Sequence, residues 1–324
     1  MNLWKAAYGL FFFLTIYGNG FSQDVEFSQY YGNPLYLNPA LTGVSDDPRL
    51  TLNFRSAMPV QWGDYITYSA SFDQYTEALH GGVGIQVFND RQGQGALNSY
   101  HTSLNYSYIF DITPEVTASA GFKTAFNYRF LDVSGLSFPD MNSTSGVTNE
   151  FITSQSNYFF DFSFGLMLWN RKSYLGIAAD HLTEPNQSLQ NDYPVPLFRK
   201  YSLHAGHEII LYDRLERPGV YLSPNIIAQY QNGFTKINLG VYLHNDMLTA
   251  GFWLRQDLLF NISDVVIMLG YSDDYFTLAY SYDIPVNKYQ RKNPHFGAHE
   301  VTFLLNLQYK ETRKKIRAIK CPKI

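Results

Sequence analysis

The segment His204-Ala-Gly-His207-Glu208 is the first place where residue types could do chemistry, because histidines and carboxylates are common zinc ligands. The residues around it alternate between apolar and polar side chains, and this alternation predicts a β-strand. Side chains three positions apart on a strand point to opposite faces. His204 and His207 should therefore face opposite sides of the sheet, and we predict no metal site.

The run Gly81-Gly82-Val83-Gly84 is glycine-rich, but no helix follows it, as a phosphate-binding loop requires. A glycine inside a strand usually marks a bend or a close approach of another backbone. No serine, histidine and aspartate share a local context that supports nucleophilic catalysis. We therefore predict no enzyme, no catalytic residue and no cofactor.

The elements that position these residues have a period of two, which is the pattern of strands. In residues 98–110 one face carries Tyr100, Thr102, Leu104, Tyr106, Tyr108 and Phe110, and the other carries Ser99, His101, Ser103, Asn105 and Ser107. The pattern predicts about fourteen strands, with boundaries uncertain by ~2–4 residues. They lie near 49–56, 64–73, 81–89, 98–110, 115–130, 157–169, 173–183, 200–212, 219–231, 234–245, 247–256, 263–271, 274–284 and 299–310.

These strands are long enough to cross a membrane. Soluble strands usually have ~5–6 residues, whereas strands of membrane barrels need ~9–11, and most segments reach the longer figure. Aromatic residues make up 17% of the chain and charged residues 16%, which favours a barrel with aromatic girdles. We predict an all-β transmembrane outer-membrane β-barrel over residues 49–310, with about 14 antiparallel strands. The alternative is a secreted soluble β-sandwich or propeller.

The connections provide a separate test, because bacterial barrels have short periplasmic turns and longer external loops. The longest connections, 131–156, 184–199 and 285–298, are odd-numbered, as they should be if both termini are periplasmic. The ninth, near Asn232-Gly233, is short for an external loop. His204 should face the lumen and His207 the lipid. We expect an ordinary polar lumen, lined by these inward charged and histidine side chains: His101, Lys123, Arg129, Asp161, Asp180, His204, Glu208 and Arg255.

The N-terminus has the features of an export signal. Lys5 precedes an apolar run from Ala6 to Tyr17, and small residues lead to a cleavage site near Ser22. We predict a signal peptide over residues 1–22, and the alternative is an anchor helix. The net charge of −4 speaks against binding to nucleic acid.

The C-terminal tail is basic: residues 311–324, with Lys310 before them, contain seven cations and one anion. Such a tail could dock an acidic periplasmic partner or anionic lipid heads, or it could be a solvated end. The candidate docking residues are Arg313, Lys314, Lys315 and Arg317. The single cysteine, Cys321, excludes an intrachain disulfide.

Residues 23–48 precede the first strand and are too apolar for a free tail. Two Asn-Pro steps, at Asn33 and Asn38, predict an irregular path rich in turns. The segment could cap the periplasmic mouth, plug the lumen or form a docking surface.

This segment carries a resemblance to a known family. The run Phe27-Ser28-Gln29-Tyr30-Tyr31-Gly32-Asn33-Pro34-Leu35-Tyr36-Leu37-Asn38-Pro39-Ala40, followed by Gly43, resembles the opening signature of the PorP/SprF family of outer-membrane proteins of the type IX secretion system. The similarity continues through Asn53-Phe54-Arg55, Pro59, Trp62, Ser69-Ala70-Ser71-Phe72-Asp73 and Gly81-Gly82-Val83-Gly84. Its specific part covers about residues 25–110.

The resemblance implies a function in export across the outer membrane, in some members related to gliding motility. The implied partners are periplasmic components of the secretion system, a large surface adhesin, or both, together with outer-membrane lipid. Carried over by resemblance, the partner-binding residues are Phe27, Gln29, Tyr30, Tyr31, Asn33, Pro34, Tyr36, Asn38, Pro39, Arg55 and Trp62.

A second hypothesis is an outer-membrane channel or transporter for small or hydrophobic solutes, which the architecture alone would allow. An open lumen would favour the channel. A lumen filled by residues 23–48 would favour the interaction protein.

Overall fold

The computed structural model describes residues 24–45, 47–57, 65–93, 95–132, 155–190, 193–212, 219–286 and 297–307. The predicted signal peptide, Trp62, Cys321 and the basic tail with Arg313, Lys314, Lys315 and Arg317 lie outside these ranges. None of the helices in the described ranges is long and apolar enough to span a membrane.

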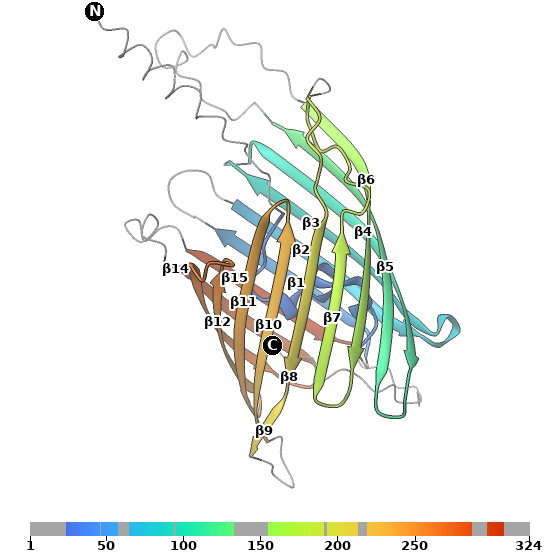
Figure 1. Ribbon diagram of the computed structural model, residues 1–324, viewed down its shortest axis with the longest axis vertical. Coiled ribbons are helices and arrows are strands. Elements are labelled where there is room, and N and C mark those ends of the chain that lie inside the picture. The colour runs from blue at the N-terminus through green and yellow to red at the C-terminus, as the bar shows by residue number, and fades with distance from the viewer. Residues whose placement is uncertain are drawn as a thin grey trace, which may run out of the picture.

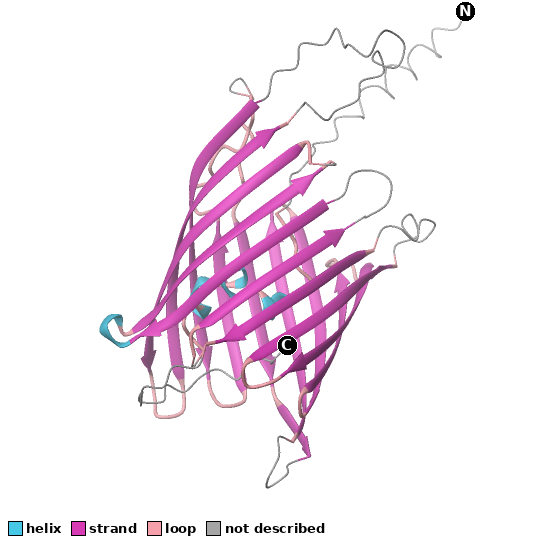
Figure 2. Ribbon diagram, turned by 180° about the vertical axis from the view of Figure 1, so that it is seen from behind, coloured by secondary structure: helices cyan, strands magenta, loops and turns pink. Residues whose placement is uncertain are grey.

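The described chain forms one antiparallel sheet that closes into a barrel (Figures 1 and 2). Its strands are β1 (Arg49–Ala57), β2 (Tyr65–Thr76), β3 (Gly81–Gln92), β4 (Leu97–Asp111), β5 (Thr117–Leu131), β6 (Gln155–Trp169), β7 (Ser173–Asp180), β8 (Lys200–His207), β9 (Ile209–Tyr212), β10 (Val220–Gln231), β11 (Phe234–Asn245), β12 (Leu248–Gln256), β13 (Ile262–Ser272), β14 (Phe276–Pro285) and β15 (Ala298–Asn306).

Two pairings establish closure. The first strand, β1, pairs with both β2 and β15, so that Arg49 lies opposite Asp73 on one side and Asn306 on the other. Strand β10 pairs with β11 along its whole length. Because β8 and β9 both pair with β10 and follow one another, they are two parts of one barrel position. The prediction of 14 antiparallel strands is confirmed.

The two faces of the strands have the predicted chemistry. In β4, Tyr100, Leu104 and Phe110 are exposed on the outer surface, whereas Ser103 and Ser107 are buried on the lumen side. A closed barrel satisfies its backbone hydrogen bonds between strands, so only side chains meet the lipid. The outer surface is accordingly apolar and aromatic, and the lumen is polar.

Two strand boundaries differ from the expectation. The predicted strand 200–212 is interrupted at Glu208, which lies between β8 and β9 rather than in the lumen wall. The predicted strand 173–183 ends at Asp180, because His181 has a positive φ of 58° that no strand continues through. The residues after it contact β6 instead: Leu182 N donates to Phe162 O at 3.0 Å.

The barrel has two distinct ends. We call the loop end the one with the β1–β2, β3–β4, β5–β6, β7–β8, β10–β11, β12–β13 and β14–β15 connections, and the turn end the opposite one. The β10–β11 connection at the loop end is a two-residue hairpin. Asn232 and Gly233 have φ values of 46° and 84°, as a type I′ turn requires. The connection between β10 and β11 therefore adds little height to the barrel wall at the loop end.

Three short helices lie inside the barrel (Figure 2). They are η1 (Tyr30–Gly32), α2 (Pro34–Leu37) and η2 (Pro39–Leu41). Pro34 and Pro39 begin α2 and η2, where a missing backbone N–H costs nothing. The two Asn-Pro steps thus place the predicted turns in the N-terminal segment.

Candidate functional site: the segment inside the barrel

Residues 24–45, here called the lumen segment, cross the barrel from one end to the other. At the loop end Asp24 forms an ion pair of 2.7 Å with Lys200, which lies opposite Gln231 at the end of β10. At the turn end Gly43 N donates to Asp73 Oδ2 at 2.8 Å. Leu307 also lies at the turn end, where its N donates to Pro48 O at 2.8 Å. The described chain therefore starts and stops at opposite ends, while residues 1 and 324 lie outside the described ranges.

A buried charge cluster holds the lumen segment at Ser28. Arg55 Nη2 lies 2.9 Å from Asp283 Oδ2, and Arg55 Nη1 lies 3.1 Å from Glu300 Oε2. Arg255 contributes a second cation, 3.1 Å from Asp283. Ser28 Oγ donates to Asp283 at 2.6 Å, accepts from Arg255 at 3.0 Å and is also bonded to Arg55. Three strands far apart in the sequence thus converge on one hydroxyl.

The Glu300 carboxylate binds the backbone next to this hydroxyl. It accepts from Ser28 N at 2.6 Å and from Gln29 N at 3.1 Å. The Gln29 side chain donates to Ser281 Oγ at 3.2 Å and to Glu300 O at 3.0 Å. Hydrogen bonds to a charged acceptor are stronger than neutral ones, so this point is a firm attachment of the segment to the wall.

Toward the loop end the attachments are ion pairs with the acidic start of the segment. Asp24 lies 2.8 Å from His181 Nε2, and the other ring nitrogen lies 2.6 Å from Asp161. Burial would lower the pKa of His181, but the two carboxylates outweigh it and raise this pKa to about 9. Burial would raise the pKa of Asp24, yet His181 and Lys200 hold it well below its usual value. Both groups are therefore charged at neutral pH.

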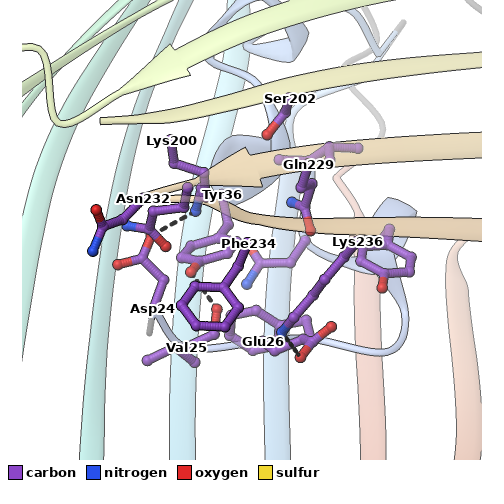
Figure 3. A pocket seen from close by; sticks show the side chains of 15 residues that line it. Asp24, Val25, Glu26, Tyr36, Lys200, Ser202, Gln229, Asn232, Phe234 and Lys236 are labelled. Carbon is purple, nitrogen blue, oxygen red and sulfur yellow. Dashed lines mark hydrogen bonds and ion pairs between the residues drawn. The ribbon is translucent and has the colours of Figure 1, made fainter. Parts of the chain in front are cut away.

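Glu26 forms the second pair, with its carboxylate 2.7 Å from Lys236 (Figure 3). The same carboxylate lies 3.3 Å from Arg255. Burial would raise the pKa of the Glu26 carboxyl, but Arg255 and Lys236 lower it to about 2. Figure 3 also shows the pocket between this part of the segment and the wall, which Val25, Tyr36, Ser202 and Phe234 help to line.

Further toward the turn end the contacts are aromatic. Tyr30 packs on Trp253 with ring centroids 5.3 Å apart, and Tyr31 meets Tyr174 at 5.8 Å and Tyr242 at 6.4 Å. These rings belong to one hydrophobic cluster with Leu37, Ala40, Leu41 and Val44. Most of the buried apolar core of the described chain is thus made by the lumen segment and the wall facing it.

At Asn38 the segment lies directly on the wall. Asn38 Nδ2 donates to Ile177 O at 3.1 Å and to Leu166 O at 3.3 Å, and it lies 3.0 Å from His204 Nε2. A β-carbon added at Gly121 would lie 2.3 Å from Ala40 N. One at Gly165 would lie 1.9 Å from Asn38 Oδ1, so glycine is needed at both positions for this approach.

Gly82, in the glycine run Gly81–Gly84, has the same role. A β-carbon on Gly82 would lie 2.1 Å from Thr42 O. Gly43 faces it with a φ of 65°, a conformation that favours glycine. Of the two expectations for a strand glycine, a bend or a close backbone approach, the structure shows a close approach at Gly82, and the approaching backbone belongs to the lumen segment.

Comparison with known proteins identifies the family of this chain. A family model described as "Type IX secretion system membrane protein PorP/SprF" matches residues 19–305. The chain belongs to the PorP/SprF family. No functionally curated protein matches it.

Solved structures agree on the fold of this PorP/SprF protein. The P. putida toluene transporter TodX superposes with a TM-score of 0.51 at 11% identity, over 84% of this chain and 93% of TodX. The monoaromatic hydrocarbon channel CymD gives 0.51 at 11%, over 86% and 94%. The protein is an outer-membrane β-barrel of this architecture.

The structure brings most of the candidate partner-binding residues of this PorP/SprF protein together inside the barrel. Phe27 packs edge-on against Tyr36 at 5.0 Å, and Asn33 accepts from Gln86 Nε2 at 2.6 Å. These candidates are buried or half-buried by the wall: Phe27, Gln29, Tyr30, Tyr31, Asn33, Pro34, Tyr36, Asn38, Pro39 and Arg55. Partner binding by them stays a prediction, and contact with a partner would require the segment to move.

Sequence reasoning missed the residues of the wall that hold the segment. Asp283 and Glu300 were not singled out, and neither were Lys200, Lys236 and His181. The available signal was the inward position of a carboxylate in a strand, since Asp283 and Glu300 alternate with outward Tyr and Val residues.

Among the charges and histidines predicted to line the lumen, several are paired. Lys123 lies 2.9 Å from Asp180, and His101 lies 2.7 Å from Asn127. His204 is buried on the lumen side and His207 is exposed, as predicted. Within the described ranges no group of three His, Cys, Asp or Glu residues could hold a metal ion.

Proposed function

We propose that this PorP/SprF barrel supports type IX export or surface attachment of cargo, such as a large adhesin, by docking periplasmic machinery or the cargo itself. The observation that carries the proposal is the filled lumen: the lumen segment contacts the wall from Asp24 to Gly43. A solute path through the barrel would have to break the Ser28 cluster and the Asn38 contacts. Docking at the barrel ends would leave both in place, whereas docking through the lumen segment would first have to release that segment.

The orientation belongs to this proposal. The loop end would be external and the turn end periplasmic, as in barrels whose long loops face outward. The signal peptide would be cleaved near Ser22. The basic tail, with Arg313, Lys314, Lys315 and Arg317, would dock an acidic partner or anionic lipid on the periplasmic side.

The first test is quantitative proteomics of surface and secreted fractions, comparing the wild type with a clean deletion of the gene. Loss of all type IX cargo would make the protein a core component. Loss of one large adhesin would make it that adhesin's partner, and gliding would then be assayed. If neither changes while uptake of a nutrient falls, the proposal is wrong and the channel hypothesis replaces it.

A second test addresses the lumen segment. Deleting residues 25–40 should leave a folded, heat-modifiable barrel, because the strands pair with one another without the segment. The same deletion should abolish co-purification of the partner. Retained co-purification would show that docking does not need the segment.

A further inference from the structure

A lumen pocket at the loop end contains one cation and one carboxylate that bind neutral groups and not each other. Arg129 and Asp90 both line this pocket. Arg129 Nη1 donates to Gln187 Oε1 at 2.7 Å. Asp90 accepts from Thr67 Oγ1 and from Gln92 Nε2, both at 2.7 Å. Within the described ranges Arg129 and Asp90 form no ion pair with each other.

The other cations of this pocket are paired. Each has a close carboxylate: Lys123 has Asp180 at 2.9 Å, Lys200 has Asp24 at 2.7 Å and His181 has Asp161 at 2.6 Å. Buried charges normally pair, because leaving one without an opposite charge is costly. Asp90 is only 5% exposed. Arg129 and Asp90 are therefore exceptions in this pocket, and one bound molecule could satisfy both.

The strand register explains why these two groups do not meet. Asp90 on β3 lies opposite Ser99 on β4, and Ser99 lies opposite Arg129 on β5. Two strand spacings of ~4.8 Å place the backbones of Asp90 and Arg129 ~10 Å apart. Ser99 also lines the pocket, and its short side chain fills little of the space between the two charges.

The next row of inward residues, one step toward the turn end, forms the floor of this space. Phe88 lies opposite His101, and His101 lies opposite Asn127. The rings of Phe88 and His101 stack with centroids 4.3 Å apart, and His101 Nδ1 lies 2.7 Å from Asn127 Oδ1. In the described part of the chain Asn127 Nδ2 and Arg129 Nε have no hydrogen-bond partner. Two donors on one face of β5 thus lack an acceptor.

We propose that this pocket binds a small zwitterion, an amino acid or another molecule with one carboxylate and one ammonium group. The carboxylate accepts from Arg129 Nε and Asn127 Nδ2, and the ammonium donates to Asp90. Asp90 can accept this bond because a carboxylate offers about four acceptor positions, and Thr67 and Gln92 each use one. The proposal does not rest on the export function, so either can fail without the other.

The test uses the full chain in lipid nanodiscs, with its arginines labelled with ¹⁵N for NMR. The Nε–Hε resonance of Arg129 is identified by its absence in Arg129→Lys. Glycine is the probe, because it carries an ammonium and a carboxylate and no side chain. Glycine should move the Arg129 resonance to a saturating value. Acetate and methylammonium, which each carry one of the two charges, should bind at least about tenfold more weakly.

Substitutions separate the two halves of the site. Asp90→Asn keeps the size of the side chain and removes its charge, so glycine should bind at least about tenfold more weakly while acetate loses no affinity. Asp246→Asn is the matched control, because Asp246 is an exposed carboxylate in the β11–β12 turn at the opposite end. It should leave the affinity for glycine unchanged. Asn127→Ala should weaken glycine and acetate alike, since both lose the same donor.

The proposal is overturned if glycine causes no saturable shift of the Arg129 resonance. It is also overturned if acetate binds as tightly as glycine, which would mean a site for carboxylates alone. An equal loss of glycine affinity in Asp90→Asn and Asp246→Asn would contradict the assigned position of the ammonium. Heat-modified gel mobility shows whether each variant folds, and the comparison of the three probes needs only the wild type.

Discussion

Arg55 should determine how firmly the lumen segment is held. It is the residue of β1 that contacts Ser28, Asp283 and Glu300 at once. Arg55→Ala leaves two buried carboxylates with Arg255 as the nearest remaining cation. Removing one partner of a buried ion pair typically costs ~3–5 kcal/mol.

Part of this cost persists when the segment leaves the lumen, so about 3 kcal/mol is a reasonable share for the segment itself. Because 1.4 kcal/mol corresponds to a tenfold change in an equilibrium constant, the open population should rise on the order of a hundredfold. Hydrogen exchange with mass spectrometry, on peptides that cover residues 28–33, measures this opening directly.

Lys236→Ala provides the matched comparison. The side chains of Lys236 and Glu26 are 35% and 26% exposed, so this pair is partly solvated. It should contribute less than about 1 kcal/mol and change exchange by about fivefold or less. Equal exchange in the wild type and in folded Arg55→Ala would refute the assignment of the buried cluster as the main attachment, as would a larger effect of Lys236→Ala.

Two other predictions test the segment's remaining attachments. Gly121→Val should displace the lumen segment at Ala40, because the new β-carbon would lie 2.3 Å from Ala40 N. The overpacking should cost about 3 kcal/mol. The displaced segment should open the lumen, so ion conductance in planar bilayers should rise. Unchanged conductance would mean that the strand moves instead. His181 should stabilise the attachment of the lumen segment fully below its ordinary pKa of 6.5. This stabilisation should be lost as pH rises through about 9, because the pKa of His181 is raised in the folded state. Exchange of the Asp24 region, corrected for intrinsic rates, should therefore increase across this window, and His181→Gln should remove the pH dependence.

The barrel could be predicted from the sequence because the alternation of its side chains can be read within each strand. A strand with lipid on one side and a polar lumen on the other must alternate, and β4 does so from Tyr100 to Phe110. The errors in strand boundaries lie where pairing between strands, and not the pattern within one strand, decides where a strand ends. Nothing in the alternation of 200–212 shows that the ladder with β7 ends where Ser173 lies opposite His207, one residue before Glu208.

The site could be predicted only in part, because its contacts are far apart in the chain. Gln29 and Glu300 are separated by 271 positions, and no periodicity relates them. Periodicity therefore left cap, plug and docking surface open for residues 23–48. The useful signal was glycine at inward strand positions, as at Gly82 and Gly121, where a polar side chain would otherwise be expected.

The chemistry of the lumen segment changes along its length, and this gradient bears on which side a partner could engage it. The loop-end half is held by charges, including Asp24 and Glu26, whose side chains are 17% and 26% exposed. The turn-end half lies on glycines and is held by Asn38 and the aromatic cluster, with Gly43 bonded to the wall. Water and competing charges reach the first half and not the second, so release of the lumen segment should begin at Asp24.

A partner that contacts Phe27–Tyr31 must then approach from the loop end, where surface cargo would lie, while a partner at the turn end would leave the segment in place. Exchange of residues 24–29 that increases when purified cargo is added, with residues 38–43 unchanged, would support this order, and the reverse pattern would contradict it.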